Sequence, residues 1–204
     1  MSGALPTSPE FNALSFQEEV NTLISVSDSG RRFARQIDNQ RWKFTCKYVN
    51  LTRAEFAPIF AFITKQRGSK ETFTITPPNL KNALGSETTT ISVNGSHTAG
   101  DTTIAIDGFN ADSAGSLKAG DFIKFAHDKI YMVVADVTAD GSNEATITIE
   151  PPLTTALADD SSVTYDDVAF TVHLTNDVQE FGIVGVDKDG NNLYKYEFDV
   201  EETL

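Results

Sequence analysis

The sequence predicts a mainly β protein: a β-sandwich domain with one α-helix at about 52–67, interrupted by an inserted small OB-like β-barrel. Three observations support this fold class. Apolar and polar residues alternate over several short stretches, as they do in half-buried strands. Only one stretch carries apolar residues at helical spacing. Between about 86 and 162 the composition shifts toward glycine, serine and threonine, and turn motifs separate short apolar runs, which is typical of a small barrel.

The first structured stretch favours three strands. Apolar residues predict a strand over 22–27, followed by a turn at 27–30, and the next stretch predicts two strands joined near Asp38-Asn39. The second of these strands alternates strictly, which predicts one buried and one polar face. The expected buried face holds Trp42, Phe44, Cys46 and Tyr48, and the polar face holds Arg41, Lys43, Thr45 and Lys47.

A helix is the expected next element. Thr52 and Glu55 have the spacing of a capping box, in which the two residues satisfy each other's free backbone N–H groups. Phe56, Ile59, Phe60 and Ile63 then form one apolar stripe, which we interpret as core packing. Gly68 supplies a left-handed helix end. Pro58 lies beyond the first turn, so a kink is expected there.

The middle of the chain predicts a barrel without helices. Five short strands are separated by Asn-Gly, Asp-Gly and Gly-Asp turn motifs, which suits an OB-like barrel or a compact sandwich. The expected strands cover 88–93, 102–106, 121–126, 130–138 and 144–149.

The closing segment returns to longer alternating strands, expected at 169–174, 181–186 and 193–200, with a hairpin turn at Asp189-Gly190. These strands have no core of their own, so they need to pair with the first part of the chain. The sequence therefore predicts a discontinuous domain, 1–85 plus 163–204, with residues 86–162 inserted as the barrel.

Charge divides the 204 residues unevenly. Residues 1–80 hold ten Lys and Arg against seven Asp and Glu, whereas the rest of the chain is strongly acidic and brings the net charge to −13. An acidic surface argues against nucleic acid as a partner, because phosphate binding requires Lys and Arg. Two interpretations stay open: copies that meet basic surface to acidic surface, or an acidic surface that keeps the protein soluble.

Several other classes are not favoured. No apolar run has the length of a membrane helix, no secretory signal is evident, and the single cysteine, Cys46, excludes an internal disulfide. The three histidines have no metal-ligand spacing, and the 187–192 stretch departs from a calcium loop and favours a hairpin turn. We expect no catalytic, cofactor-binding or metal-binding residues, no cofactor and no enzymatic activity.

The order of parts resembles the distal tail proteins of long-tailed siphophages, of the type with an OB-fold domain inserted in the ring-forming domain. The stretches that carry the resemblance are LTRAEFAPIFAFITKQRG, TFTITPP, LKAGDFIKFAHDKIYMV and LYKYEFDVEETL. It implies a structural virion protein at the distal end of the tail, forming a homohexameric ring. It implies as partners the tail tube protein, a baseplate hub or straight-fibre protein and, through the barrel, host-surface polysaccharide, with neither nucleic acid nor membrane insertion.

Two sets of residues follow as candidate sites. For a ring interface, basic residues of the first part would face acidic residues of the next copy, and reversing Arg31 and Arg32 to Glu is expected to prevent the ring. For the alternative function, a carbohydrate-binding module, Phe122 and Phe125 are the candidate glycan contacts, unless their rings fill the barrel interior. The interface candidates are Arg31, Arg32, Arg35, Arg41, Asp199, Glu201 and Glu202, with Lys43, Asp187, Asp189 and Glu197 beside them.

Overall fold

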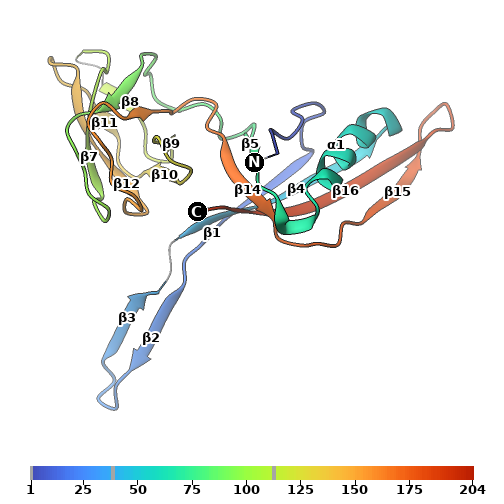
Figure 1. Cartoon of the computed structure of the whole chain (residues 1–204), viewed down its shortest axis with the longest axis horizontal. Helices are drawn as coiled ribbons and strands as arrows, with labels where there is room; N and C mark the ends of the chain where they lie inside the picture. The colour runs from blue at the N-terminus through green and yellow to red at the C-terminus, as the bar shows by residue number, and fades with distance from the viewer. Residues whose placement is uncertain (1, 38–39, 112–113) are drawn as a thin grey trace. The chain divides into compact units, whose positions relative to one another are not determined.

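The computed structural model describes residues 2–37, 40–111 and 114–204 (Figure 1). The described chain is mainly β with one α-helix, which confirms the predicted fold class. It divides into two compact units, residues 1–74 with 172–203 and residues 75–171 with Leu204. The expected turn at Asp38-Asn39 lies outside the described residues.

The first unit is built on one six-stranded sheet in the order β1-β4-β16-β14-β5, with β15 paired to β16. A separate two-stranded ribbon, β2–β3, lies between β1 and β4 in the chain. The elements are β1 (Ala13–Glu19), β2 (Thr22–Val26), β3 (Arg32–Gln36), β4 (Arg41–Leu51), α1 (Arg53–Lys65), the 3-10 turn η1 (Gly68–Lys70), β5 (Phe73–Ile75), β14 (Phe170–Leu174), β15 (Phe181–Val186) and β16 (Asn192–Glu202).

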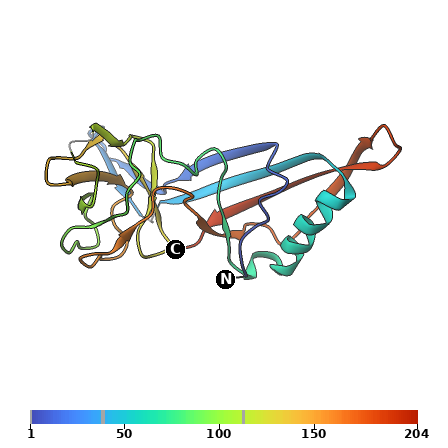
Figure 2. The same ribbon diagram turned by 90° about the horizontal axis from the view of Figure 1, so that it is seen from above.

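The helix α1 packs on one face of this sheet (Figure 2). The capping box at Thr52 and Glu55 is present, and Thr52 takes the N-cap position that the sequence predicts. Phe56 and Phe60 contact the Tyr196 ring of β16 edge-on, with ring centroids 6.0 and 5.6 Å apart. The β4 alternation is also confirmed, because Trp42, Phe44, Cys46 and Tyr48 are all buried. The buried face of the sheet is therefore apolar, and its opposite face carries the charges.

The second unit is a nearly closed barrel-like sheet. Its strands follow the order β13-β6-β7-β12-β10-β9, and an isolated bridge between Lys124 and Thr164 links the β9 end to the residue that follows β13. A separate two-stranded sheet, β8–β11, also belongs to this unit. The elements are β6 (Ile91–Val93), β7 (Thr103–Asp107), β8 (Ala114–Leu117), β9 (Phe122–Lys124), β10 (Ile130–Val133), β11 (Val137–Thr138), β12 (Glu144–Glu150) and β13 (Ser162–Val163).

The unit boundaries fall at 74/75 and 171/172, whereas the sequence places the ends of the insert at 85/86 and 162/163. The flanking segments belong to the barrel because they bond to each other and to it. Ala83 N–H donates to the Asp166 carboxylate at 3.0 Å, Leu84 N–H donates to Asp121 at 2.7 Å, and the Tyr165 hydroxyl donates to the Thr89 carbonyl at 2.5 Å.

Candidate assembly surface

The polar face of the β4–β16 pair holds much of the predicted ring interface. Antiparallel register places Lys43 opposite Glu201, Thr45 opposite Asp199 and Lys47 opposite Glu197. Residues directly opposite each other on one face are close enough to pair. The basic side of β4 and the acidic side of β16 therefore meet within one chain.

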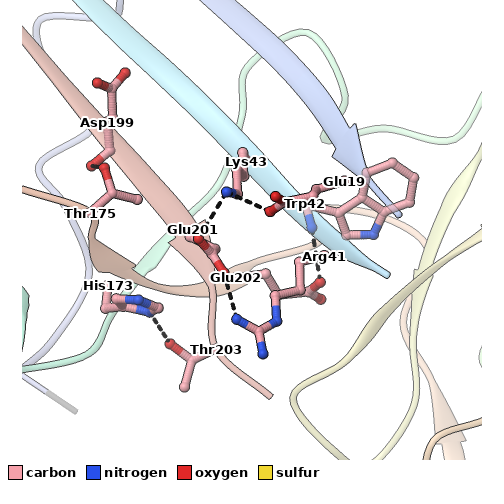
Figure 3. A network of polar contacts seen from close by, with 10 residues as sticks. All are labelled: Glu19, Arg41, Trp42, Lys43, His173, Thr175, Asp199, Glu201, Glu202 and Thr203. Atoms are coloured by element: carbon pink, nitrogen blue, oxygen red, sulfur yellow. Dashed lines mark hydrogen bonds and ion pairs between the residues drawn. The ribbon is translucent and has the colours of Figure 1, made fainter. Parts of the chain in front are cut away.

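Glu201 is the centre of this network (Figure 3). Arg41 Nη1 donates to Glu201 Oε1 at 2.7 Å, and Lys43 Nζ lies 3.2 Å from Glu201 Oε2 and 2.5 Å from Glu19 Oε2. Burial by itself raises the pKa of the Glu201 carboxyl, but the hydrogen bonds from Arg41 and Lys43 outweigh it and hold this pKa below its ordinary value. The bond to Glu19 raises the pKa of Lys43.

The remaining acidic candidates on β16 are also occupied inside the chain. Asp199 Oδ1 accepts from the Thr45 hydroxyl at 2.6 Å. Glu202 is buried, and its Oε2 accepts from the Trp42 backbone N–H at 3.3 Å. The burial of Glu202 corrects its place in the predicted ring interface. Arg41, Asp199 and Glu201 form pairs within the chain, and their place in an interface stays a prediction.

The other three arginines lie elsewhere. Arg32 and Arg35 belong to the β2–β3 ribbon and Arg31 to the turn before β3, and all three are exposed. In this ribbon every residue of both strands is exposed. Arg31 lies over the Phe33 ring, with its guanidinium carbon 5.3 Å from the ring centroid.

Large apolar side chains line both faces of this ribbon. Ser25 pairs with Phe33 and Leu23 with Arg35 on one face, while Ile24 and Val26 alternate onto the other. The ribbon residues Leu23, Ile24, Val26 and Phe33, with Ile37 just beyond β3, are each 52–62% exposed. A two-stranded ribbon is marginally stable alone, and contiguous apolar exposure marks an interaction surface. The ribbon is therefore a candidate contact surface.

A second exposed apolar region belongs to α1 and β15, which lie at the end of the same unit away from the ribbon (Figure 1). Here α1 and β15 border a groove of about 460 Å³. Phe181 contacts the rings of Phe56 and Phe60 at 4.9 and 5.0 Å between centroids, and it is still 45% exposed. The groove is lined by Arg53, Phe56, Ala57, Phe60, Ala61, Phe181 and Tyr194.

The apolar stripe of the helix is predicted as core packing, and the groove beside it was not expected from the sequence. The detectable signal was the uncharged run of β15, FGIVGV, which has no polar face. Ile183, Val184 and Val186 continue the apolar exposure along β15. An uncharged edge strand of this kind is unusual on a surface that stays in water.

The candidate glycan contacts lie inside the second unit. Phe122 and Phe125 are 4% and 3% exposed. Phe122 contacts Phe170 edge-on at 5.7 Å, and Phe125 lies 5.5 Å from the Tyr131 ring. A sugar ring needs an accessible aromatic face, and these rings do not offer one. Their burial corrects the expectation that they contact a glycan.

No metal-ligand group is found in the part of the chain that the structure describes, where no three His, Cys, Asp or Glu side chains gather suitably. Nor does any described helix have the length and apolar character needed to cross a membrane. The 187–192 stretch forms the expected hairpin turn, in which the Asp187 carboxylate accepts from the backbone N–H groups of Asp189 and Asn191.

Comparison with known proteins assigns the chain to no family. No family model matches it, and no curated protein matches it.

Proposed function

We propose that the chain is a structural subunit of a phage tail tip, which assembles with copies of itself into a ring at the distal end of the virion's tail. The resemblance implies that six copies form this ring. In this role it joins the tail tube protein to a baseplate hub or straight-fibre protein. Its function is to hold neighbours together, without turnover of a substrate.

The observation that carries the proposal is the β2–β3 ribbon. All ten of its strand residues are exposed, and both of its faces present apolar side chains beside arginines. Packing against its own sheet would cover only one of those faces. Contact with another protein molecule removes both from water, and the burial of apolar area is the main favourable term in such association.

The β4–β16 pairing narrows the set of basic residues that the proposed interface uses. Since Arg41 and Lys43 are engaged by Glu201 inside the chain, the basic contribution to an interface comes from Arg31, Arg32 and Arg35. The glycan-binding alternative finds no comparable support, because the rings proposed for it are buried.

The test measures molar mass by light scattering from micromolar to millimolar concentration. The wild-type chain is expected to form a closed oligomer. The double variant Arg31→Glu, Arg32→Glu is expected to remain a folded monomer, because both positions are exposed and the new charges repel the interface.

A matched control makes the same change in net charge outside the ribbon, by Lys70→Glu with Lys81→Glu. This control is expected to assemble normally. A wild-type chain that stays monomeric over the whole range, or an Arg31→Glu, Arg32→Glu variant that assembles like the wild type, would count against the proposal.

A further inference from the structure

The first unit carries two exposed apolar surfaces that differ in shape. The β2–β3 ribbon protrudes, with Leu23 and Phe33 on one face, whereas the region between α1 and β15 is hollowed. The ribbon lies at one end of the unit, and α1 and β15 lie at the other (Figure 1). A ribbon of one copy therefore reaches the groove of another copy more readily than its own.

The floor of the groove suits an inserted ring. Ala57 and Ala61 are exposed, lie one turn apart on α1 and leave room above the helix. Phe60, Phe181 and Tyr194 supply aromatic walls, and Phe56 stacks on Tyr194 with centroids 5.0 Å apart. Aromatic walls around a small-residue floor favour an aromatic or branched aliphatic side chain as occupant.

Charge points to the same pairing. The ribbon from 22 to 36 holds three arginines, Arg31, Arg32 and Arg35, against one aspartate, Asp28. The segment from 180 to 191, which begins beside the groove, holds three carboxylates, Glu180, Asp187 and Asp189, against one lysine, Lys188. The 22–36 segment thus carries a net charge of +2, and the 180–191 segment carries −2, of which Arg53 in the groove lining offsets one. Complementary charge fixes register at an interface.

We infer that the occupant of the α1–β15 groove is the β2–β3 ribbon of a second copy of this chain, with Phe33 and Leu23 facing the groove and the arginines facing Glu180, Asp187 and Asp189. The inference rests on the proposed function and deepens it by naming both sides of the contact. A contact between two different surfaces is heterologous, and repeating it gives a ring where the rotation between copies closes and an open filament where it does not.

The test uses two full-length variants that each lose one side of the contact. Phe33→Asp removes the ribbon side and keeps the groove. Ala61→Arg fills the groove, adds a charge that repels the arginines, and keeps the ribbon. Both positions are exposed, and arginine is a good helix former, so both variants are expected to fold, as circular dichroism will show.

Each variant alone is expected to be monomeric by light scattering. Their equimolar mixture is expected to form a one-to-one dimer and to stop there, with an apparent Kd at least tenfold below that of either variant alone. The double variant, Phe33→Asp with Ala61→Arg, is the matched control, because it has neither side and is expected to pair with no single variant.

The outcomes separate the two proposals. If the wild type assembles and the mixture stays monomeric, the groove belongs to a different chain or the ribbons pair with each other; the inference is then overturned and the ring proposal stands. If the wild type never assembles, both fall. Dimers formed by either single variant alone would also overturn the inference, because they require an isologous contact.

Discussion

Lys43 and Glu201 lie opposite each other on β4 and β16, with the lysine Nζ 3.2 Å from the glutamate Oε2. Their positions differ by 158 in the sequence, so only the pairing of the first and last parts of the chain brings them together. Arg41 bonds the other oxygen of the same carboxylate at 2.7 Å. The network therefore joins β4 to β16 within one chain, and it engages both cations with the same carboxylate.

Glu201→Gln is expected to destabilise the first unit. The substitution removes the charge that accepts from Arg41 and Lys43 in a half-buried setting, and hydrogen bonds to charged groups contribute about 2 kcal/mol to the free energy of unfolding. Denaturant unfolding followed by the fluorescence of Trp42, the only tryptophan in the chain, measures this loss.

The matched control is Glu197→Gln on the same strand. Its pair with Lys47 is more exposed, with 53% and 48% of the two side chains accessible. Exposed pairs contribute less than about 1 kcal/mol, so a loss for Glu197→Gln equal to that for Glu201→Gln would contradict the role assigned to burial.

Tyr48→Phe is expected to leave the protein as stable as the wild type, or to stabilise it by about 1 kcal/mol. The Tyr48 hydroxyl is buried without a hydrogen-bond partner in the part of the chain that the structure describes, so removing it relieves the cost of desolvation. Burial also raises the pKa of this hydroxyl, so it stays protonated. Urea unfolding of the two proteins checks the prediction.

Tyr196→Phe provides the comparison, since the Tyr196 ring is equally buried but its hydroxyl donates to Gln179 Oε1 at 2.7 Å. This variant is expected to lose about 1 kcal/mol of unfolding free energy. Equal losses of unfolding free energy for the two substitutions would mean that the Tyr48 hydroxyl forms a hydrogen bond in solution.

Glu87→Gln is expected to destabilise the barrel-like unit. In the wild type, the stabilisation that the Glu87 carboxylate contributes is expected to depend on pH. The buried Glu87 carboxylate accepts from the backbone N–H groups of Thr88, Thr89 and Asn110 and from the Thr89 hydroxyl. Burial alone raises the pKa of Glu87, but these hydrogen bonds outweigh it and lower the pKa.

A carboxyl whose pKa is lower in the folded state stabilises the fold above the unfolded pKa, about 4.3 for glutamate, and this stabilisation is lost as the pH falls through the folded value. Wild-type hydrogen exchange at the 87–89 and 108–110 segments should therefore accelerate, relative to the intrinsic rate, below about pH 4. The variant Glu87→Gln should lack this pH dependence, whereas the exposed Glu144→Gln should retain it.

Gly68→Ala is expected to cost more stability than Gly30→Ala. Both glycines have positive φ, +71° and +78°, where a Cβ is disfavoured by about 1–2 kcal/mol. A Cβ at Gly30 meets open space, but at Gly68 it meets the Asp177 carboxylate, whose Oδ1 accepts from the Ser69 backbone N–H at 2.8 Å. Thermal unfolding of both variants isolates that clash, and equal melting temperatures would exclude it.

The local features of this protein follow from residues that are close together in the sequence. The alternation of β4, the capping box of α1 and the turn at Asp189-Gly190 depend on neighbouring residues, whose spacing follows the geometry of a strand, a helix or a tight turn. Local spacing did not predict β1 or β8 as strands, since an edge strand or a two-stranded pair depends on its partner.

Which charges and rings remain available to other molecules depends on long-range packing. Register paired Arg41 and Lys43 with Glu201, the barrel enclosed Phe122 and Phe125, and β15 left Phe181 at the rim of a groove beside α1. Such outcomes depend on contacts between residues far apart in the chain, and local spacing carries no information about them. Charge composition identified the basic ribbon and the acidic C-terminal strands, but the fold determined that Arg31, Arg32 and Arg35 stay exposed whereas Arg41 pairs with Glu201.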